Sequence, residues 1–129
     1  MGAEQLQTVA DAFERWSAGD FDGAAALCTE DVEWYPRIDL DQRVARGREQ
    51  VAAMFRDRAE HVDLRMDFSR MEPVGDEVVV HVLAEATGGE SGAKVAEDWF
   101  QLHRLQDGLI CKIENFDTRE QAVAAAEAG

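Results

Sequence analysis

The stretch EDWFQLHRLQDGLICKIENFDTREQAVAAA, residues 97–126, decides the fold. At its centre Asp107-Gly108 supplies the two positive-φ positions of a tight hairpin turn, and apolar and polar residues alternate on both sides. Near its end Thr118-x-x-Gln121 forms a capping box, a helix start signal, before an alanine-rich run. The stretch therefore predicts two antiparallel strands followed by a C-terminal helix.

The turn also sets a register that divides the hairpin into two faces. A two-residue turn pairs Gln106 with Leu109, and hence Leu102 with Ile113. One face then carries Asp98, Phe100, Leu102, Arg104, Leu109, Cys111, Ile113 and Asn115, and the other carries Trp99, Gln101, His103, Leu105, Ile110, Lys112, Glu114 and Phe116. The first face is apolar in its middle, with polar groups towards one end. Because polar groups on the inner face of a sheet usually line a cavity, this face predicts a pocket.

Helical periodicity dominates the first half of the chain. Apolar residues predict an amphipathic helix over residues 3–18, and Asp20 caps a short second helix that reaches Cys28. A brief strand over residues 32–35 and a polar loop over residues 38–47 follow, and Gly47 opens a third helix.

A period of two takes over at Val62, which indicates strands. The alternation slips at Arg70-Met71, predicting a bulge, and Gly75-Asp76 turns the chain into the next strand. The segment GGESG connects to a strand that begins near Ala93. Helices first and antiparallel strands afterwards are typical of an α+β fold.

Composition narrows the classes of partner. A chain of 129 residues suits one domain, and 27 acidic against 13 basic side chains give a net charge of −14. Such a surface repels phosphate groups, which argues against nucleic acid and membrane as partners. No apolar run approaches the roughly 20 residues that span a bilayer. The acidic, amphipathic N-terminus does not resemble a secretory signal.

The cysteines and the absence of known motifs both bear on whether the protein holds a metal or a cofactor. Cys28 and Cys111 are far apart in apolar segments, which predicts buried free thiols in a reducing cytoplasm rather than a disulfide or metal pair. The sequence contains no H-x-x-x-H, C-x-x-C, G-x-G-x-x-G, Walker loop or G-x-S-x-G motif. We therefore expect no metal and no cofactor.

The order of elements, ααβαββββα, resembles the nuclear transport factor 2-like superfamily. The segments AGDFDGAAAL (residues 18–27), GREQVAAMF (47–55), DGLI (107–110) and DTREQA (117–122) are similar to its SnoaL-like, ketosteroid isomerase-like branch. The resemblance implies a single SnoaL-like domain over residues 1–129. It implies a cone-shaped, bent antiparallel sheet packed on N-terminal helices, a cystatin-like αβ roll, with a short C-terminal helix. Known members include isomerases, hydratases, polyketide cyclases, epoxide hydrolases and oligomerisation modules.

The resemblance also allows the ketosteroid isomerase mechanism to be checked by position. That mechanism needs a carboxylate base beside a tyrosine and a protonated aspartic acid. The segment Asp98-Trp99-Phe100 resembles the one bearing the acid, but the tyrosine aligns with Ala12 and the base with Tyr35 or Pro36. Two of the three positions lack the required group, so ketosteroid isomerase activity is not expected.

Other acid–base chemistry remains open in the predicted pocket. Asp98 is the candidate acid or hydrogen-bond donor, with His81 or Tyr35 as its partner and Asn115 orienting the substrate. The alternatives are structural: an ion pair of Asp98 with Arg104 or another arginine at the sheet edge, an interface role for His81, and a backbone hydrogen bond for Asn115. A lining of aromatic side chains is expected from Phe13, Trp16, Trp34, Phe55 and Phe100, with plain core packing as the alternative.

Three functions compete. The first is a small-molecule pocket protein, acting as a cofactor-free isomerase, cyclase or hydratase on an apolar metabolite by acid–base catalysis. The second is a non-catalytic binder of such a molecule. The third is a dimerisation module, because Trp99, Leu105, Ile110 and Phe116 on the second hairpin face predict a homodimer packed through the outer sheet face, as the resemblance also implies.

Overall fold

The computed structural model describes residues 2–36, 44–61, 63–88 and 93–128. The helices are α1 (Gly2–Ser17), α2 (Phe21–Ala25), α3 (Gly47–His61) and α4 (Arg119–Glu127). The strands are β1 (Cys28–Tyr35), β2 (Ala45–Arg46), β3 (Asp63–Val74), β4 (Glu77–Gly88), β5 (Ala93–Gln106) and β6 (Leu109–Phe116). Among the elements in these described residues, the short β2 is the one that the sequence did not predict.

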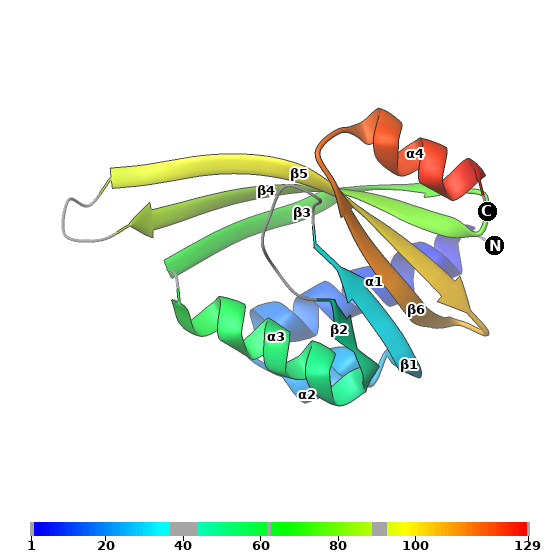
Figure 1. Ribbon diagram of the computed structural model, residues 1–129, viewed down its shortest axis with the longest axis horizontal. Coiled ribbons are helices and arrows are strands. Elements are labelled where there is room, and N and C mark those ends of the chain that lie inside the picture. The colour runs from blue at the N-terminus through cyan, green and yellow to red at the C-terminus, as the bar shows by residue number, and fades with distance from the viewer. Residues whose placement is uncertain (1, 37–43, 62, 89–92, 129) are drawn as a thin grey trace.

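The strands form one bent sheet in the order β2-β1-β6-β5-β4-β3. Neighbouring strands are antiparallel except β1 and β6, which run parallel, so the sheet is mixed rather than purely antiparallel. Figure 1 shows α1, α2 and α3 against one face, called the inner face here, and α4 across the opposite, outer face. This is the predicted α+β architecture with a short C-terminal helix.

Helix ends follow the local sequence signals. Gly19 ends α1 with φ +82°, a conformation that glycine adopts without strain. The Asp20 carboxylate caps α2 by accepting from Gly23 N at 2.9 Å, and Thr118 with Gln121 forms the capping box of α4. The second helix is shorter than predicted, because Leu27 O accepts from Ile110 N at 2.9 Å and draws the chain into the sheet just before Cys28.

Some predicted segments fall partly outside the described residues. Of the polar loop over 38–47, residues 38–43 lie outside them, and Ala45–Arg46 forms β2. Of the GGESG connection, residues 89–92 lie outside them. The predicted bulge in β3 is confirmed, since the pairing with β4 shifts register between Asp67 and Arg70. Within the described part of the chain, no helix is long and apolar enough to span a bilayer.

A bulge in the β5–β6 hairpin changes the predicted faces. Gln106 pairs with Leu109 as expected, but a register shift next to the turn leaves Cys111 without an opposite residue. Leu102 consequently pairs with Glu114, not with Ile113. One extra residue on one strand exchanges the faces of every residue beyond it. The predicted pairing of the two strands is therefore wrong beyond the turn.

The choice of inner face was also wrong. Trp99, Gln101 and His103 of β5 face the helices, whereas Phe100 and Leu102 lie on the outer face. The reason is α4, which covers the outer face and makes a second small core in which Leu102 packs with Val79 and Ala122. Both hairpin faces therefore bury apolar side chains, and apolar content could not distinguish the inner from the outer one.

The residues on which the predicted dimer rested are packed within the chain. Trp99 and Ile110 are buried in the main core and Leu105 packs against it, while Phe116 packs with the α4 cluster. Trp99 and Ile110 are thus not available to a second copy, whereas Leu105 and Phe116 are only partly buried. The homodimer itself stays a prediction.

Candidate functional site: an uncharged cavity under the inner face

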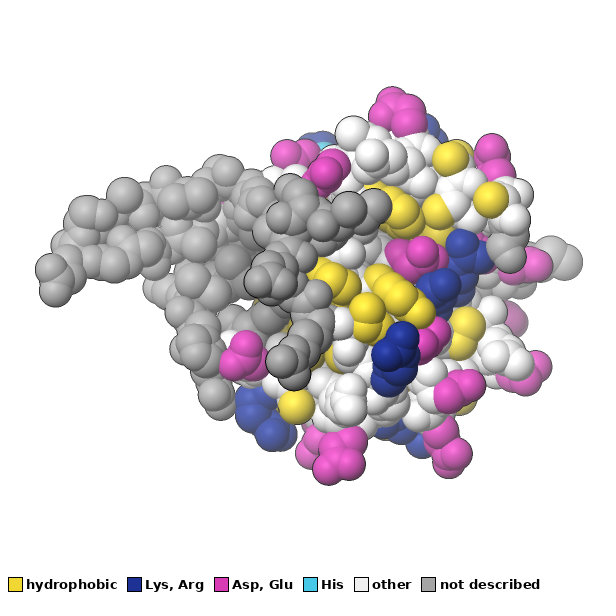
Figure 2. Space-filling view, viewed as in Figure 1, with side chains coloured by type: hydrophobic (Ala, Val, Ile, Leu, Met, Phe, Trp, Pro, Cys, Tyr) yellow, Lys and Arg dark blue, Asp and Glu magenta, His cyan; other side chains and the backbone are white. Residues whose placement is uncertain are grey.

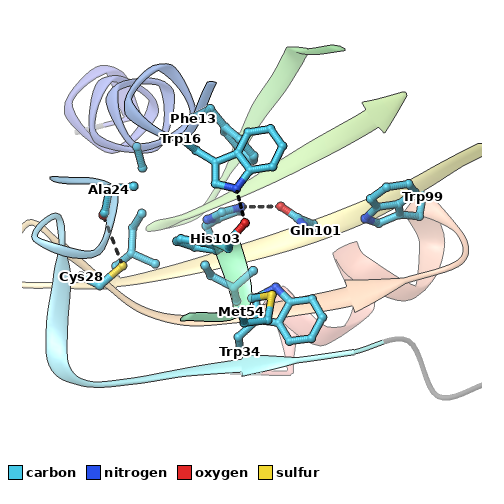
Figure 3. Close-up of a pocket in the computed structure, with 13 residues that line it drawn as sticks. Phe13, Trp16, Ala24, Cys28, Trp34, Met54, Trp99, Gln101 and His103 are labelled. Carbon is cyan, nitrogen blue, oxygen red and sulfur yellow. Dashed lines mark hydrogen bonds between the residues drawn. The ribbon is translucent and has the colours of Figure 1, made fainter. Parts of the chain in front are cut away.

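A cavity of about 60 Å³ lies between the inner face of the sheet and the helices. It is lined by Ala12, Phe13, Trp16, Ala24, Cys28, Trp34, Met54, Phe55, Trp99, Gln101, His103, Ile110 and Ile113. None of these side chains is a carboxylate, an ammonium or a guanidinium. Figure 3 shows the aromatic rings and the Gln101–His103 pair arranged around this space.

Aromatic side chains of α1 shape the helical side of the cavity. Phe13 and Trp16 are three residues apart and share one face of the helix. Phe13 stacks on Phe68 of β3 with ring centroids 4.1 Å apart, and Trp16 Nε1 donates to Phe55 O of α3 at 3.3 Å. The wall of the cavity therefore joins α1 to both β3 and α3.

Three polar side chains on the inner face form a hydrogen-bonded chain, named the amide relay here. Asn115 Nδ2 donates to Tyr35 O at 2.7 Å, Gln101 Nε2 donates to Asn115 Oδ1 at 3.0 Å, and His103 Nε2 lies 3.0 Å from Gln101 Oε1. Gln101, His103 and Asn115 are 8%, 3% and 7% exposed. Figure 3 shows the last link, between His103 and Gln101.

His103 ends the amide relay in an unusual state. Burial lowers the pKa of its imidazole from 6.5 to about 3, so the ring is neutral at physiological pH. Its Nδ1 is buried and has no hydrogen-bond partner among the described residues, while Phe13 packs edge-on against the ring at 5.5 Å. An unmade hydrogen bond at a buried polar atom costs about 1–3 kcal/mol. Among the described residues of the wall, this nitrogen is the one buried side-chain nitrogen or oxygen without a hydrogen-bond partner.

The predicted catalytic pair forms, but away from the cavity. His81 Nε2 lies 2.9 Å from Asp98 Oδ2, and the His81 ring stacks on Phe100 with centroids 4.4 Å apart. The two side chains are 21% and 59% exposed and lie on the outer face. The expectation that Asp98 and Phe100 point into the pocket is therefore wrong, because their face of β5 is the outer face of the sheet and not the inner one. The alternative ion pair with Arg104 is not formed, because that guanidinium binds other carboxylates.

Tyr35 and Asn115 were expected to act on a substrate through their side chains, but their contact with each other is a hydrogen bond to backbone. Asn115 bonds to the backbone carbonyl of Tyr35, which is the structural alternative, and also to Gln101, which links it to the cavity wall. The Tyr35 ring lies under Lys112 Nζ at 4.8 Å, a cation–π contact, and does not line the cavity.

Four of the expected aromatic residues lie in the wall: Phe13, Trp16, Trp34 and Phe55. Their role in binding a ligand stays a prediction, as do the catalytic roles of Asp98, His81 and Tyr35.

Sequence reasoning missed Trp99, Gln101 and His103 as wall residues. A signal for them exists, because their face of β5 carries neutral polar groups while the other face carries the charged Asp98 and Arg104. Neutral amides and imidazoles tolerate burial far better than charged groups do.

No group of three or more His, Cys, Asp and Glu side chains is placed to hold a metal ion in the part of the chain that the structure describes.

Three N-terminal helices against a bent sheet, a cavity between them and a helix closing the outer face define a protein of the nuclear transport factor 2-like superfamily. Within it the chain belongs to the SnoaL-like domain family, whose model matches residues 9–113.

Solved structures agree with this assignment. A nuclear transport factor 2-like protein from Burkholderia xenovorans LB400 is 22% identical, with TM-score 0.76 over 98% of this chain and 97% of that one. A Mycobacterium tuberculosis protein in complex with estradiol-17beta-hemisuccinate is 19% identical, with TM-score 0.74 over 93% and 97%. An LEH-like epoxide hydrolase of M. tuberculosis is 18% identical, with TM-score 0.71 over 98% and 95%. At such identities the likeness shows the fold alone. None of the curated proteins compared with the chain is a match.

Proposed function

We propose that the protein binds a small, largely apolar molecule in the cavity under the inner face. The observation that carries the proposal is a wall of aromatic and aliphatic side chains that holds a buried, neutral imidazole, one nitrogen of which has no partner among the described residues. In a core that only stabilises the fold, a buried polar atom without a hydrogen bond is unfavourable. Ligand pockets, in contrast, combine an apolar lining with a few polar groups that orient the ligand.

The size of the cavity limits the ligand. One water needs about 10–15 Å³ on the same measure, so a cavity of about 60 Å³ has room for about four to six waters. This corresponds to a molecule of about one ring. The complex of the similar M. tuberculosis protein with estradiol-17beta-hemisuccinate supports small-molecule binding on this fold; a ligand that large would require the present wall to move.

The chain supplies its own reporter for a binding test. Its three tryptophans, Trp16, Trp34 and Trp99, all line the cavity, so their indole N–H signals in NMR spectra report on it. We expect titration with single-ring alcohols to shift these signals saturably. Ala12→Phe, which fills the cavity from α1, should abolish the shifts. The matched control Ala53→Phe, at an exposed position of α3, should leave them intact. Unchanged binding by Ala12→Phe would refute the site.

Acid–base catalysis in the same cavity is a second candidate. It is favoured by His103 Nδ1, which has no hydrogen-bond partner among the described residues, and by the LEH-like epoxide hydrolase of the same fold. Because the described wall has no carboxylate, His103 would have to act as the base. A pKa of about 3 makes it a weak one, which is why we place binding first. Turnover of a bound molecule that disappears in His103→Gln would support catalysis; turnover unaffected by that change would exclude His103 as the base.

A further inference from the structure

The direction of the amide relay is fixed from one end. A backbone carbonyl can only accept, so the atom of Asn115 that faces Tyr35 O must be the amide nitrogen. Asn115 then presents its oxygen to Gln101, and Gln101 in turn presents its oxygen to His103. Turning either amide over would set two acceptors or two donors against each other. His103 therefore meets an acceptor, and its Nε2 must carry the proton.

The remaining nitrogen follows from the charge of the ring. A neutral imidazole carries a single proton, and burial keeps His103 neutral. With that proton on Nε2, Nδ1 presents a bare lone pair. Nδ1 is also the atom that is buried without a partner in the described part of the chain. A backbone carbonyl on β1 thus fixes, through two amides, which nitrogen of the His103 ring carries the proton.

We propose that the cavity selects molecules that donate a hydrogen bond, such as alcohols, over equally sized ketones and ethers that can only accept. The selecting atom is His103 Nδ1, and Gln101 and Asn115 are positioning residues that hold its tautomer. The inference rests on the binding function proposed above. Because Phe13 packs edge-on against the imidazole, we expect its ring to shift when a donor reaches Nδ1.

The tautomer can be measured without any ligand. In ¹⁵N NMR spectra of the intact protein, His103 Nε2 should give a protonated, pyrrole-type signal and Nδ1 an unprotonated, pyridine-type signal. The reverse assignment would overturn the inference, whatever the protein binds. Asn115→Leu cuts the relay at its anchored end and should mix the two tautomers.

Selectivity is tested with cyclohexanol and cyclohexanone, which have the same number of heavy atoms, by titrating the tryptophan indole signals. We expect the alcohol to bind about tenfold more tightly, since the ketone leaves Nδ1 unpaired and sets an oxygen lone pair against it. Asn115→Leu should bring the two affinities together. The control Phe55→Leu, in the wall but outside the relay, should change both affinities by the same factor.

Equal affinities in the unaltered protein, or a preference for the ketone, would overturn the selectivity. If neither molecule binds while the ¹⁵N signals are as expected, the proposed binding function fails and the ligand preference falls with it, but the direction of the amide relay stands. If Asn115→Leu does not fold, the tautomer and the affinity ratio of the unaltered protein still decide the question.

Discussion

The two histidines of the central strands lie on opposite faces of the sheet. His103 of β5 is on the inner face, is buried, and is held by the neutral amide of Gln101. His81 of β4 is on the outer face, is partly exposed, and is held by the carboxylate of Asp98. Burial beside a neutral amide keeps the His103 imidazole neutral, whereas the partner of His81 is a largely exposed carboxylate.

The same contrast extends across the sheet. On the inner face Gln101, His103 and Asn115 form an uncharged hydrogen-bonded chain, which leaves only His103 Nδ1 without a partner among the described wall residues. The outer face uses ion pairs: Arg104 donates to Glu114 at 2.9 Å and to Glu77 at 3.2 Å. Figure 2 shows basic and acidic side chains among apolar ones over the area of β1 and β6. Substitutions on the uncharged inner face and substitutions in the ion pairs of the outer face should therefore differ in their effects on stability and ligand binding.

The largest expected difference is between the two thiols. Cys28 lines the cavity, and burial raises its pKa from 9.0 to about 12, which lowers its thiolate fraction about a thousandfold. Cys111, at the hairpin bulge, is only partly buried, and burial raises its pKa as well. With a thiol reagent the native protein should react at Cys111 first and at Cys28 only on unfolding. Rapid native modification of a Cys111→Ser variant would contradict this order.

The next largest effect is expected from Arg104→Met. Arg104 holds Glu77, Glu114 and, through Nη2 to Ala125 O at 2.8 Å, the end of α4. Burial already raises the pKa of Glu77, and the guanidinium opposes that rise. Removing it strands two largely buried carboxylates, so the free energy of unfolding should fall by about 2–4 kcal/mol. Chemical denaturation measures this change.

An exposed ion pair supplies the control. Arg46 pairs with Glu33 at 3.0 Å, but its side chain is 66% exposed. Arg46→Met should leave the free energy of unfolding unchanged within error. Equal losses in the two variants would show that the Arg104 cluster is no better shielded from water than the Arg46 pair.

His103 should make the protein less stable as the pH falls. Its folded pKa, about 3, lies below the 6.5 of the unfolded chain, so between these values only the unfolded state binds the proton. Stability from this group is complete above about pH 6.5 and is lost below it. From about pH 7.5 to about pH 5.5 the loss should be about 1.4 kcal/mol.

Two variants isolate this contribution. His103→Gln removes the titrating group and should flatten the pH dependence over that interval by the stated amount. His81→Gln, on the outer face, should leave the buried His103 contribution in place. A pH dependence of His103→Gln identical to that of the unaltered protein would show that His103 is not held neutral.

Most of the fold could be predicted because its signals are local. A turn dipeptide, a capping box, an N-cap aspartate and two periodicities each depend on a few neighbouring residues, and each is found in place. The end of α2 was misplaced because it is set by Ile110, more than eighty positions along the chain. The parallel pairing of β1 with β6 is non-local in the same way.

The site was harder to predict because the face on which the β6 residues lie depends on a single extra residue, Cys111. The bulge at Cys111 has no local marker such as glycine, and it moves Asn115 onto the same face as Gln101. In addition, α4 packs on the outer face of the sheet, so that this face also carries buried apolar residues. The inner face can then no longer be recognised by its apolar residues alone. Aromatic residues on helices were placed well, because helical spacing carries no such ambiguity.

The smallest effect is expected at Asp98. On the sequence-based premise this carboxyl lay in an apolar cavity; in the structure it is a largely exposed partner of His81. Asp98→Asn and Asp98→Leu should each change the free energy of unfolding by less than about 1 kcal/mol, as is usual for exposed pairs. Neither should alter the titration of the tryptophan signals by cyclohexanol, because the side chain lies on the far side of the sheet from the cavity. A clear loss of binding in Asp98→Asn would mean that the outer pair acts on the cavity through the sheet, and the independence of the two faces would then have to be abandoned.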